Sequence, residues 1–479
     1  MTRFLLSVLL TLIPHLVFPQ DNPIDLFLSD SSMHHAAVSL CIIGADSGEI
    51  ILEHNSVKSL IPASVMKLVT TAAAIELLGP EYKFKTVMGY TGSLKKRSGK
   101  LKGNIIIKGG GDPALGSRYF TEHYKDFLDE WVREIKQLGI KKIKGKVLAD
   151  DSYYDYQPVP SKWLWEDMGN YYGAGAYGLS AFDNTFEIHL KTGPEGTLPE
   201  ISGIIPVDYD NELTDWLISS GTSDEGYVFA APYSSSGWIA GTVPADMEDF
   251  ILKASVADPP LLLAKMMDKR LEDEGISVSE KPVTYRTEKA IPANEIITVT
   301  EISSPPLSAI IEVLNHQSVN LFAEHLIKEM GKQFNNDGST SSGLLVVEDF
   351  LRNAGIDTDG FFIEDGSGLS PLDALTSSGL AHLLLYMRTS GKNFPEYYSS
   401  LPDAGLEGTL KNWFRDPVFL SRLKAKSGSM TRVRSYTGYF TTLSGKDMIF
   451  SIIVNNYTGP SRYVVAGIEQ IIKYVIINK

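Results

Sequence analysis

The sequence predicts a mixed α/β (α+β) fold, in which an antiparallel sheet flanked by helices is interrupted by an insertion of two modules. Three observations support this architecture. A long helical pattern lies near the N-terminus at residues 62–78, helical patterns dominate again from Ser308, and the chain closes on strand patterns and a last helix. Between these parts, residues 83–297 change to a basic segment and then to a segment rich in Tyr, Trp, Gly and Pro. We therefore expect one domain that the insertion splits in two.

The elements of the first half each have a local signal. The helix at 62–78 has Pro62 at its start and ends at Gly79-Pro80, residues that are typical of a helix start and stop. An apolar period near that of a helix predicts an amphipathic helix at 124–138. Runs of β-favouring residues predict strands at 83–90, 101–108, 146–150, 186–190 and 227–230.

The second half is richer in helices. The patterns predict helices at 259–274, 309–314, 321–330, 342–353, 377–387 and 465–477, and strands at 435–442 and 448–455. We expect the main domain at 21–82 and 298–479, the first inserted module at 83–148 and 280–297, and the second inserted module at 149–279.

The first twenty residues differ in kind from the rest. Arg3 precedes an apolar stretch at 4–17 that is broken by Pro14 and His15, and the polar residues Gln20, Asp21 and Asn22 follow it. The stretch is too short and too interrupted for a membrane span, and the pattern is typical of a signal peptide at 1–20. The alternative is a buried core helix. The signal predicts an exported protein, periplasmic or extracytoplasmic.

Charge and composition exclude several partners. The formal net charge of −14 disfavours nucleic acid, because a phosphate backbone needs a basic surface. Cys41 is the single cysteine, which excludes an intrachain disulfide and a zinc site built from several cysteines. The nine histidines show no His-Glu-x-x-His or other ligand spacing. We expect no metal and no cofactor.

A serine and a lysine three residues apart form the first chemical motif. On a helix this spacing puts both side chains on one face, so that the amine can reach the hydroxyl. The pattern occurs three times, at Ser64/Lys67, Ser93/Lys96 and Ser421/Lys424. Ser64 alone lies in the first turn of a predicted helix, where free backbone N–H groups help to stabilise developing negative charge. The other two are interpreted as solvated surface.

Two further motifs accompany the first in active-site-serine acyl-transfer enzymes: Ser-x-Asn and Lys-[Ser/Thr]-Gly. Ser-x-Asn occurs once, at Ser318/Asn320. Lys-[Ser/Thr]-Gly occurs twice, at 191–193 and 426–428. The residue after the glycine must donate its N–H to an oxyanion, and Pro194 has none, whereas Ser429 has one. The chemistry selects Lys426. The alternative is that three common tripeptides occur in this order by chance.

The three motifs and their surroundings resemble the D-alanyl-D-alanine carboxypeptidase/endopeptidases, the class C low-molecular-mass penicillin-binding proteins of the penicillin-binding protein 4 type. The likeness also includes Gly-Gly-Asp-Pro at 110–113, Trp-Leu-Trp-Glu-Asp at 163–167, Tyr-Tyr-Gly-Ala at 171–174 and Asp-Gly-Ser-Gly-Leu-Ser at 365–370. It implies a penicillin-binding transpeptidase/β-lactamase-like domain with a two-module insertion. The 254 positions between Ser64 and Ser318 are too many for a class A β-lactamase.

The mechanism expected for such a protein assigns catalytic roles to five residues. Ser64 would be the nucleophile, and Lys67 would be the base, with a pKa lowered by burial and by the neighbouring cation Lys426. Ser318 would relay the proton to the leaving amine, and Asn320 would hold Lys67 and the substrate amide. The N–H groups of Ser64 and Ser429 would form the oxyanion hole.

Substrate contacts are expected on both sides of the serine. The substrate-binding residues of the third motif are Ser427, Gly428 and Ser429, and Lys426 with Ser429 would bind a terminal carboxylate. The resemblance places Met430, Asp167, Trp165 and Tyr171 at positions that receive the free-amine end of a diaminopimelate-type side chain. The alternative for Asp167 is a solvated loop acid.

Two residues depart from the family pattern. Ser427 stands where the family usually has Thr, and Pro371 stands where it often has Arg, which puts an Arg-mediated substrate contact in doubt.

The expected function is a serine-type D-Ala-D-Ala carboxypeptidase, with or without endopeptidase activity on cross-links. Its partners would be peptidoglycan stem peptides, with β-lactam antibiotics as covalent inhibitors, and no nucleic acid. Residues 95–146 are basic enough for peripheral contact with anionic wall polymers or a membrane surface, although a solvated mixed-charge surface is the simpler interpretation. The alternatives are a serine β-lactamase or esterase on the same fold, and a non-catalytic cell-wall-binding protein.

Overall fold

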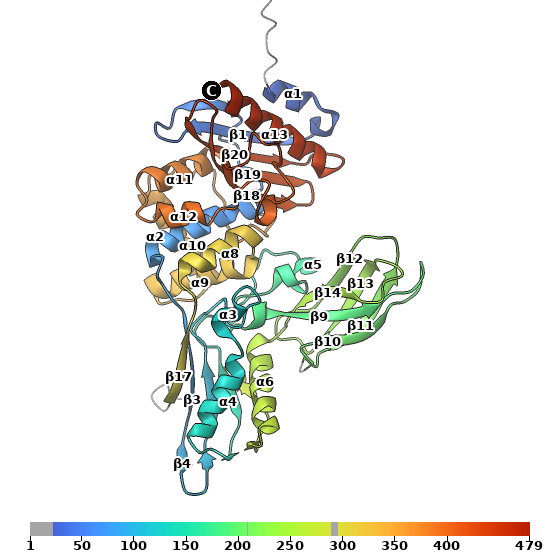
Figure 1. Ribbon diagram of the computed structural model, residues 1–479, viewed down its shortest axis with the longest axis vertical. Coiled ribbons are helices and arrows are strands. Elements are labelled where there is room, and N and C mark those ends of the chain that lie inside the picture. The colour runs from blue at the N-terminus through green and yellow to red at the C-terminus, as the bar shows by residue number, and fades with distance from the viewer. Residues whose placement is uncertain (1–22, 208, 289–295) are drawn as a thin grey trace, which may run out of the picture.

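The computed structural model describes residues 23–207, 209–288 and 296–479. Figure 1 shows three bodies: a main domain that contains the C-terminus, a first inserted module at the far end of the long axis, and a second inserted module that projects to one side. The predicted signal peptide at 1–20 lies outside the described residues. Within the described ranges, no helix is long and apolar enough to cross a membrane.

The main domain is built on one antiparallel sheet of five strands in the order β18-β19-β20-β1-β2. The strands are β1 (Ala37–Gly44), β2 (Ile50–His54), β18 (Leu423–Met430), β19 (Val433–Thr441) and β20 (Asp447–Asn455). Side chains alternate between two cores: Leu40 and Ile42 pack on one face, and Cys41 and Ile43 on the other. Because β18 stands at the end of the order, its outer edge is not paired within the sheet.

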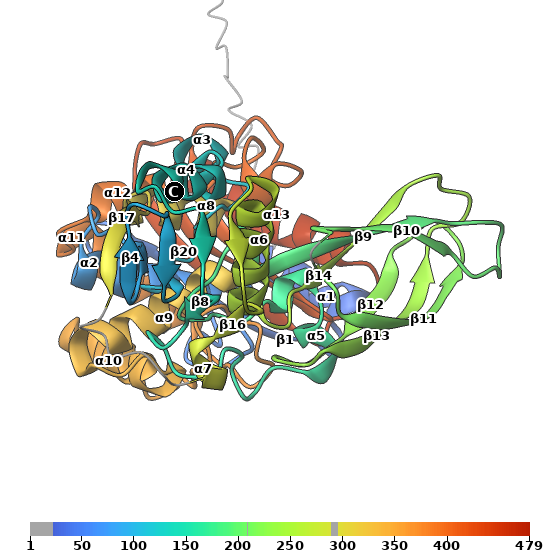
Figure 2. The same cartoon turned by 90° about the horizontal axis from the view of Figure 1, so that it is seen from below.

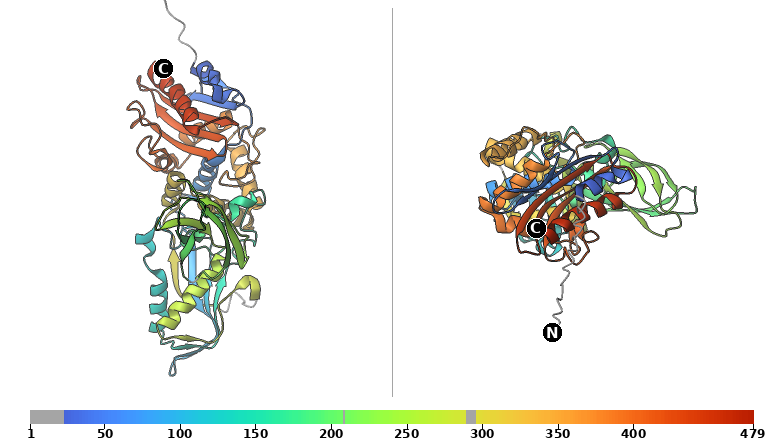
Figure 3. Two further views of the ribbon diagram at one scale, coloured as in Figure 1. Left: turned by 90° about the vertical axis from the view of Figure 1, so that its right-hand side faces the viewer. Right: turned by 90° about the horizontal axis from the view of Figure 1, so that it is seen from above.

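Helices cover both faces of this sheet (Figure 3). On one face, α1 (Pro23–Ser29) packs against α13 (Ser461–Asn478), which contacts β19. On the other face, α11 (Ser377–Thr389) contacts β1 and β20. Further helices fill the space between this face and the inserted modules: α2 (Lys67–Leu78), α8 (Leu307–Gln317), α9 (Asn320–Asn335), α10 (Thr340–Asn353) and α12 (Phe394–Ser399).

The first inserted module is a mixed sheet in the order β16-β8-β6-β3-β17. Its strands are β3 (Lys85–Tyr90), β6 (Ile105–Lys108), β8 (Val147–Asp150), β16 (Val283–Thr284) and β17 (Ile297–Ser303). A smaller sheet continues it with β4 (Ser93–Lys95), β5 (Lys100–Lys102), β7 (Lys142–Ile143) and β15 (Ser277–Val278). Its helices are α3 (Thr121–Tyr124), α4 (Phe127–Gln137), α6 (Pro259–Asp273) and α7 (Tyr285–Glu288).

Two predicted elements of this module are each divided in two. The run predicted as one strand at 101–108 forms β5 and β6, which are separated at Gly103 and Asn104. A Cβ at Gly103 would lie 1.8 Å from the carbonyl oxygen of Thr91, so the chain turns where only glycine fits. The run predicted as one helix at 124–138 is divided at Lys125, whose φ of +48° interrupts the helical conformation between α3 and α4.

The second inserted module consists of two three-stranded sheets. One has the order β10-β9-β14, from β9 (Thr185–Lys191), β10 (Glu200–Ile205) and β14 (Phe250–Ser255). The other has the order β11-β13-β12, from β11 (Glu212–Ser219), β12 (Glu225–Phe229) and β13 (Ser236–Val243). Apolar side chains from both sheets form one small core, which includes Ile188, Leu217, Val228 and Ile239. The module therefore has a core of its own, and Figure 2 shows it extending away from the other two bodies.

Two elements bear on the bounds of the inserted modules. The predicted bounds place α6 in the second module, yet α6 packs against β8 and α4 of the first. They place most of β17 in the main domain, yet β17 pairs with β3 along its length. We propose that the first inserted module comprises 83–150 and 259–303, and that the independent core of the second spans 185–255.

Glu329 on α9 connects the main domain to the insertion. Its carboxylate accepts hydrogen bonds from the hydroxyls of Tyr82, Tyr153 (3.1 Å) and Tyr154 (2.7 Å), and from the side-chain amide of Gln333 (2.8 Å). Burial raises the pKa of Glu329, and these hydrogen bonds oppose the rise. One acid therefore binds Tyr82, which precedes β3, and Tyr153 and Tyr154, which follow β8. These bonds fix α9 against the insertion.

Replacing Glu329 tests this connection. We expect Glu329→Ala to lower the free energy of unfolding by about 3 kcal/mol or more, because it leaves buried tyrosine hydroxyls without their acceptor. Denaturant titration measures the change. The control is Glu348→Ala on α10, whose carboxylate is exposed and pairs with Arg352, and it should change stability by about 0.5 kcal/mol or less. Equal losses in the two variants would contradict the assignment.

Candidate active site

Ser64 lies at the start of the predicted helix, on a short 3-10 turn. This turn, η2 (Ala63–Met66), leads directly into α2. The residue before the serine, Ala63, has a φ of +48°, an unusual conformation for a residue with a side chain. On the other side, a Cβ at Gly428 would lie 3.0 Å from the backbone nitrogen of Ser64. Glycine at this position lets β18 approach the serine closely.

Lys67 is the centre of the hydrogen-bond network around Ser64. Its Nζ lies 3.0 Å from Ser64 Oγ, 2.6 Å from Asn320 Oδ1 and 2.6 Å from the carbonyl oxygen of Ser367. The side chain is fully buried. The three acceptors match the three N–H donors of an ammonium group. In the neutral amine, the contact with Ser64 reverses, and the serine hydroxyl donates to Nζ, as a general base requires.

The electrostatic surroundings of Lys67 favour the neutral amine more than water does. Burial lowers the pKa of Lys67 to about 8, although the nearby carboxyl groups of Asp365, Glu324 and Asp373 oppose the shift. Burial and repulsion by Asp365 raise the pKa of Glu324 to about 8 and that of Asp373 to about 10. Two of the three acids therefore retain protons near neutrality, which limits the negative charge around the lysine.

Asp365 organises the loop that supplies one acceptor to Lys67. Its carboxylate accepts four backbone N–H bonds of 2.6 to 3.1 Å, from the four residues at 367–370. It also accepts a bond of 2.7 Å from Trp163 Nε1. The loop is thereby closed around the acid, with the Ser367 carbonyl turned toward Lys67. The sequence resemblance included this run but assigned it no role.

Glu324 is a second residue that the sequence analysis did not single out. Its carboxylate accepts the N–H of Gly366 at 3.1 Å, behind the same loop. It lies four residues after Asn320 on α9, and this spacing puts both side chains on one helix face. In the sequence, the only indication of Glu324 was its spacing of four residues from Asn320 in the Ser-x-Asn motif.

Lys426 and Ser318 form the other side of the site. Lys426 Nζ donates to Ser318 Oγ at 2.9 Å and to the carbonyl oxygen of Ser427 at 2.7 Å. Burial lowers the pKa of Lys426 well below its usual value, and repulsion by Lys67 adds to the effect. Ser318 has a left-handed backbone (φ 59°) at the end of α8, so the Ser-x-Asn segment is the tight link between α8 and α9. Asn320 Nδ2 donates to the carbonyl oxygen of Tyr172 at 2.8 Å.

A cavity of about 300 Å³ opens beside Ser64. Its lining combines the predicted residues Ser64, Ser318, Ser427, Gly428 and Ser429 with Thr409, Trp413, Arg434 and Tyr436. The last four come from segments without a recognised motif. Arg434 is the strand partner of Ser429 across β18 and β19. The register of these two strands could therefore have indicated that Arg434 lies beside the third motif. The Ser427 hydroxyl donates to Thr409 Oγ1 at 2.6 Å.

The predicted amine-binding residues lie outside the lining of this cavity. Trp165 and Asp167 are on α5 (Trp165–Met168), and Tyr171 is on η3 (Tyr171–Gly173). Burial raises the pKa of Asp167, whose carboxyl is already hydrogen-bonded by Tyr172. Trp165 packs near Trp238, with ring centroids 5.9 Å apart. Met430 ends β18 opposite Val433.

The rejected motifs lie elsewhere in the chain. Ser93 begins β4 in the first inserted module, and Ser421 precedes β18 with an exposed side chain. Lys191 ends β9 in the second inserted module and pairs with Glu248 at 2.8 Å. None of these residues contributes to the lining of the Ser64 cavity, as far as the described residues define it.

The histidine nearest to the Ser-x-Asn segment on α9 has a structural environment. Burial lowers the pKa of His325 to about 3, so the ring is neutral. Its Nδ1 lies 2.9 Å from the carbonyl oxygen of Gly111, and its Nε2 lies 2.9 Å from Ser180 Oγ. Both nitrogens are thereby engaged. Over the described ranges, no three His, Cys, Asp or Glu side chains gather as ligands for a metal ion.

Comparison with known proteins places this geometry in context. The model of the D-Ala-D-Ala carboxypeptidase 3 (S13) family matches residues 20–471. A D-alanyl-D-alanine carboxypeptidase of Actinomadura sp. (strain R39) is 27% identical over 452 residues, which cover 91% of this chain and 81% of that protein.

Solved structures show the same fold. The crystal structure of penicillin binding protein 4 from Haemophilus influenzae matches with a TM-score of 0.81 at 21% identity, covering 95% of this chain and 99% of that one. The same Haemophilus protein in complex with a β-lactam matches with a TM-score of 0.76 at 20% identity, with the same coverage of both chains. The predicted fold class is confirmed.

The close approach of β18 to the serine can be tested at Gly428. A Cβ there would lie 2.1 Å from Ser435 Oγ and 2.6 Å from the Pro62 carbonyl oxygen, so Gly428→Ala should push β18 away from η2. We expect the rate at which serine-directed acylating reagents label Ser64 to fall about 100-fold, as misplaced catalytic groups typically do. Gly203→Ala on β10, where a Cβ meets open space, should label at the normal rate. Normal labelling of the Gly428 variant would refute the steric argument.

Proposed function

The chain belongs to the D-Ala-D-Ala carboxypeptidase 3 (S13) family, and on this basis we propose that it is a serine-type D-Ala-D-Ala carboxypeptidase that acts through an acyl-enzyme on Ser64. One observation supports the assignment of the nucleophile above all others. The buried amine of Lys67, whose pKa is lowered to about 8, lies 3.0 Å from Ser64 Oγ. A base of this kind beside a serine is the arrangement that nucleophilic catalysis needs.

In the acylation step, Ser64 Oγ attacks the carbonyl carbon of the penultimate D-Ala. Neutral Lys67 takes the hydroxyl proton as the C–O bond forms. The carbonyl oxygen becomes an oxyanion, which the N–H groups of Ser64 and Ser429 stabilise, each typically contributing about 3 kcal/mol. Collapse of the tetrahedral intermediate breaks the peptide bond and leaves an ester on Ser64.

The leaving amine needs a proton, and Ser318 is placed to deliver one. Its hydroxyl receives a hydrogen bond from Lys426 Nζ at 2.9 Å, and it passes its own proton to the amine while the proton that Lys67 took from Ser64 replaces it, so that Lys67 is neutral again. The terminal D-Ala then departs. Water attacks the ester with Lys67 again as base, and the acid product leaves with Ser64 regenerated.

The terminal carboxylate of the substrate fits the cavity beside Ser64. Ser429 and Arg434 supply donors and positive charge at its walls, and the buried Lys426 lies behind the lining residue Ser318, to which its Nζ donates at 2.9 Å. An entering carboxylate raises the pKa of Lys426, so that this lysine carries its charge when the correct end of the peptide is bound. This pairing supports carboxypeptidase chemistry over cleavage of an uncharged ester.

The outer edge of β18 is bridged by Asp403 at Lys424, and the part of the edge from Lys426 onward suits an extended peptide. A substrate strand can add there through main-chain hydrogen bonds, and such binding tolerates a longer chain beyond the scissile bond. We therefore propose peptidoglycan stem peptides as substrates, with cross-links as a second substrate, and β-lactams as covalent inhibitors. We propose that residues 1–20 direct export and that catalysis takes place outside the cytoplasm. Contact of residues 95–146 with anionic wall polymers stays a prediction.

The roles of Ser64 and Lys67 are tested by covalent labelling. A fluorescent penicillin should label the wild-type protein, and Ser64→Ala should abolish the label because Ser64 is the one hydroxyl among the described lining residues that Lys67 contacts. Lys67→Ala should slow labelling by about 1,000-fold or more, as loss of a general base does. The matched control is Ser421→Ala, which removes the serine of another Ser-x-x-Lys sequence and should label normally. Label on the Ser64 variant would exclude Ser64 as nucleophile.

The turnover of the labelled enzyme separates the competing functions. Slow loss of the penicilloyl label, together with release of D-Ala from a stem pentapeptide, is expected of a peptidase. Rapid hydrolysis of penicillin without D-Ala release would favour a β-lactamase or esterase. An absence of both label and D-Ala release would favour a non-catalytic wall-binding protein. Mass analysis of cross-linked muropeptides after incubation measures the endopeptidase activity.

The pKa of Lys67 makes a prediction about pH. The base form of Lys67 increases as pH rises toward its pKa of about 8. The rate constant for acylation by penicillin should therefore rise about tenfold per pH unit well below 8 and level off above it. Stopped-flow or gel-based labelling between pH 5.5 and about 9 measures this profile. A rate that stays constant over that range would exclude titration of Lys67 in the free enzyme.

A further inference from the structure

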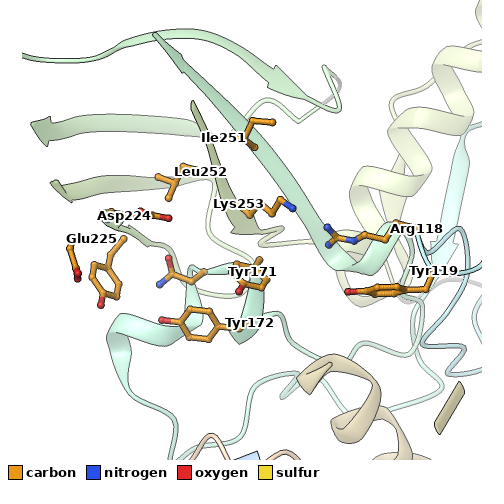
Figure 4. A pocket seen from close by; sticks show the side chains of 12 residues that line it. Arg118, Tyr119, Tyr171, Tyr172, Asp224, Glu225, Ile251, Leu252 and Lys253 are labelled. Atoms are coloured by element: carbon orange, nitrogen blue, oxygen red, sulfur yellow. Dashed lines mark hydrogen bonds between the residues drawn. The ribbon is translucent and has the colours of Figure 1, made fainter. Parts of the chain in front are cut away.

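A second cavity, of about 430 Å³, lies between the two inserted modules and the segment at 170–172 (Figure 4). Arg118 and Tyr119 line it from the first module, and Lys253 and Asp224 line it from the second. A smaller cavity shares Arg118, Tyr119, Tyr171 and Tyr172 with it and reaches Ser318 and Asn320. The two cavities thus adjoin along these four residues, between the Ser-x-Asn segment and the second inserted module.

Arg118 is held in a fixed orientation at this cavity. The carboxylate of Asp183 accepts its Nε–H at 2.9 Å and its backbone N–H at 3.3 Å. Only 8% of the Asp183 side chain is exposed, so this anchor is buried. Because Asp183 binds the Nε side of the guanidinium, the terminal amino groups extend into the cavity, as Figure 4 shows. A guanidinium held in this way is pre-organised to bind a carboxylate through two N–H groups.

The backbone that carries Asp183 is strained. Phe182, Asp183 and Asn184 have φ values of 56°, 58° and 51°, so three consecutive residues with side chains adopt left-handed conformations. Asn184 stabilises the turn, since its side chain donates to the Gly175 carbonyl oxygen at 2.9 Å and accepts the N–H of Ala181 at 3.1 Å. Strain of this kind is costly and is retained mainly where a side chain must be aimed.

Lys253 on β14 brings a second positive charge to the cavity. Figure 4 shows its side chain extending toward Arg118. Its Nζ lies 4.0 Å from Glu187 Oε1, at the limit of an ion pair, and 40% of the side chain is exposed. Asp224 and Glu225 lie on the opposite wall, and tyrosine rings line the space between. The cavity therefore suits a peptide that carries a carboxylate at one end and a cationic amine further along.

We propose that Arg118 and Lys253 form a subsite for a carboxylate of the stem peptide whose D-Ala-D-Ala end occupies the Ser64 cavity. The inference rests on the proposed function, because it takes the substrate to be a stem peptide. The carboxylate belongs either to the peptide being cleaved or to a second peptide cross-linked to it. In both cases the subsite contributes to binding and takes no part in the chemical steps at Ser64.

Steady-state kinetics on three substrates test the proposal. The first is a stem pentapeptide with free carboxylates, the second is the same peptide with its internal carboxylates amidated, and the third is a minimal N-acyl-D-Ala-D-Ala. We expect Arg118→Lys and Lys253→Glu each to raise KM for the free-carboxylate peptide about tenfold with kcat unchanged. Neither variant should change KM for the amidated or minimal substrate. The effect of the two variants on KM for a cross-linked dimer, compared with their effect on KM for the pentapeptide, identifies which peptide supplies the carboxylate.

Two controls keep the test decisive. Lys191→Glu reverses another exposed charge of the second module, one that lies outside the cavity and pairs with Glu248, and it should leave every KM unchanged. Penicillin acylation at the normal rate shows that each variant retains its active site. Because Arg118 anchors a buried carboxylate, Arg118→Lys can disturb the fold, whereas Lys253→Glu alters an exposed strand position and keeps the test informative.

The outcomes are distinct from those of the proposed function. Unchanged KM for the free-carboxylate peptide in Lys253→Glu, or an equal rise for the amidated peptide, would overturn the subsite. If the wild-type enzyme releases no D-Ala from any of the three substrates, the proposed function fails. Calorimetric binding of the uncleaved free-carboxylate and amidated peptides then decides the subsite independently, with about tenfold weaker binding of the amidated peptide expected.

Discussion

The hydrogen bonds of Lys67 are the constraint on which the rest of the site depends. One buried amine joins Ser64, Asn320 and the carbonyl of Ser367, and two of these partners lie 253 and 300 positions away in the chain. An unpaired amine in this position would be costly, so the main domain must bring all three segments together. The turn that carries Ser64, the link between α8 and α9, and the Asp365 loop are therefore positioned by one group. The bonds that hold these three segments together are also the bonds that surround Ser64.

The buried acids around Lys67 differ in how readily they lose their protons. Asp365 receives five N–H donors, which suits a carboxylate, whereas burial raises the pKa of Glu324 and Asp373 so that they retain protons. Lys426 lies on the other side with its pKa lowered by burial and by Lys67. If all the acids were charged, they would hold the proton on Lys67. Because the pKa values of two of them are raised, Lys67 can lose its proton near neutral pH, as its proposed role as a base requires.

Much of this site was predictable from the sequence because its chemistry is local. Placement at a helix start separated Ser64 from Ser93 and Ser421, and the missing N–H of Pro194 separated Lys426 from Lys191. The structure brings Ser64, Lys67, Ser318, Asn320 and Lys426 together, and the family match confirms the resemblance.

Other features left no local signal. β1 is buried on both faces, so its apolar run lacks the alternation that marks a strand, and the sequence analysis did not identify it. Arg434, Thr409 and Trp413 reach the cavity only through strand register and loop packing. Asp167 is hydrogen-bonded to Tyr172 and lies outside the Ser64 cavity, so its predicted role as an amine ligand stays a prediction.

The position of the insertion follows from the helix that supports the site. α9 begins with Asn320, which contacts Lys67, and its later turns present His325, Lys328 and Glu329 to the inserted residues. The same rigid helix thus fixes a catalytic contact at one end and the docking of the insertion along its length. Because Asn320 also donates to the Tyr172 carbonyl, the segment at 170–172, which lines the second cavity, is tied to Lys67 through one side chain. These contacts along α9 therefore fix the position of the inserted residues relative to Ser64, which the proposed carboxylate subsite requires.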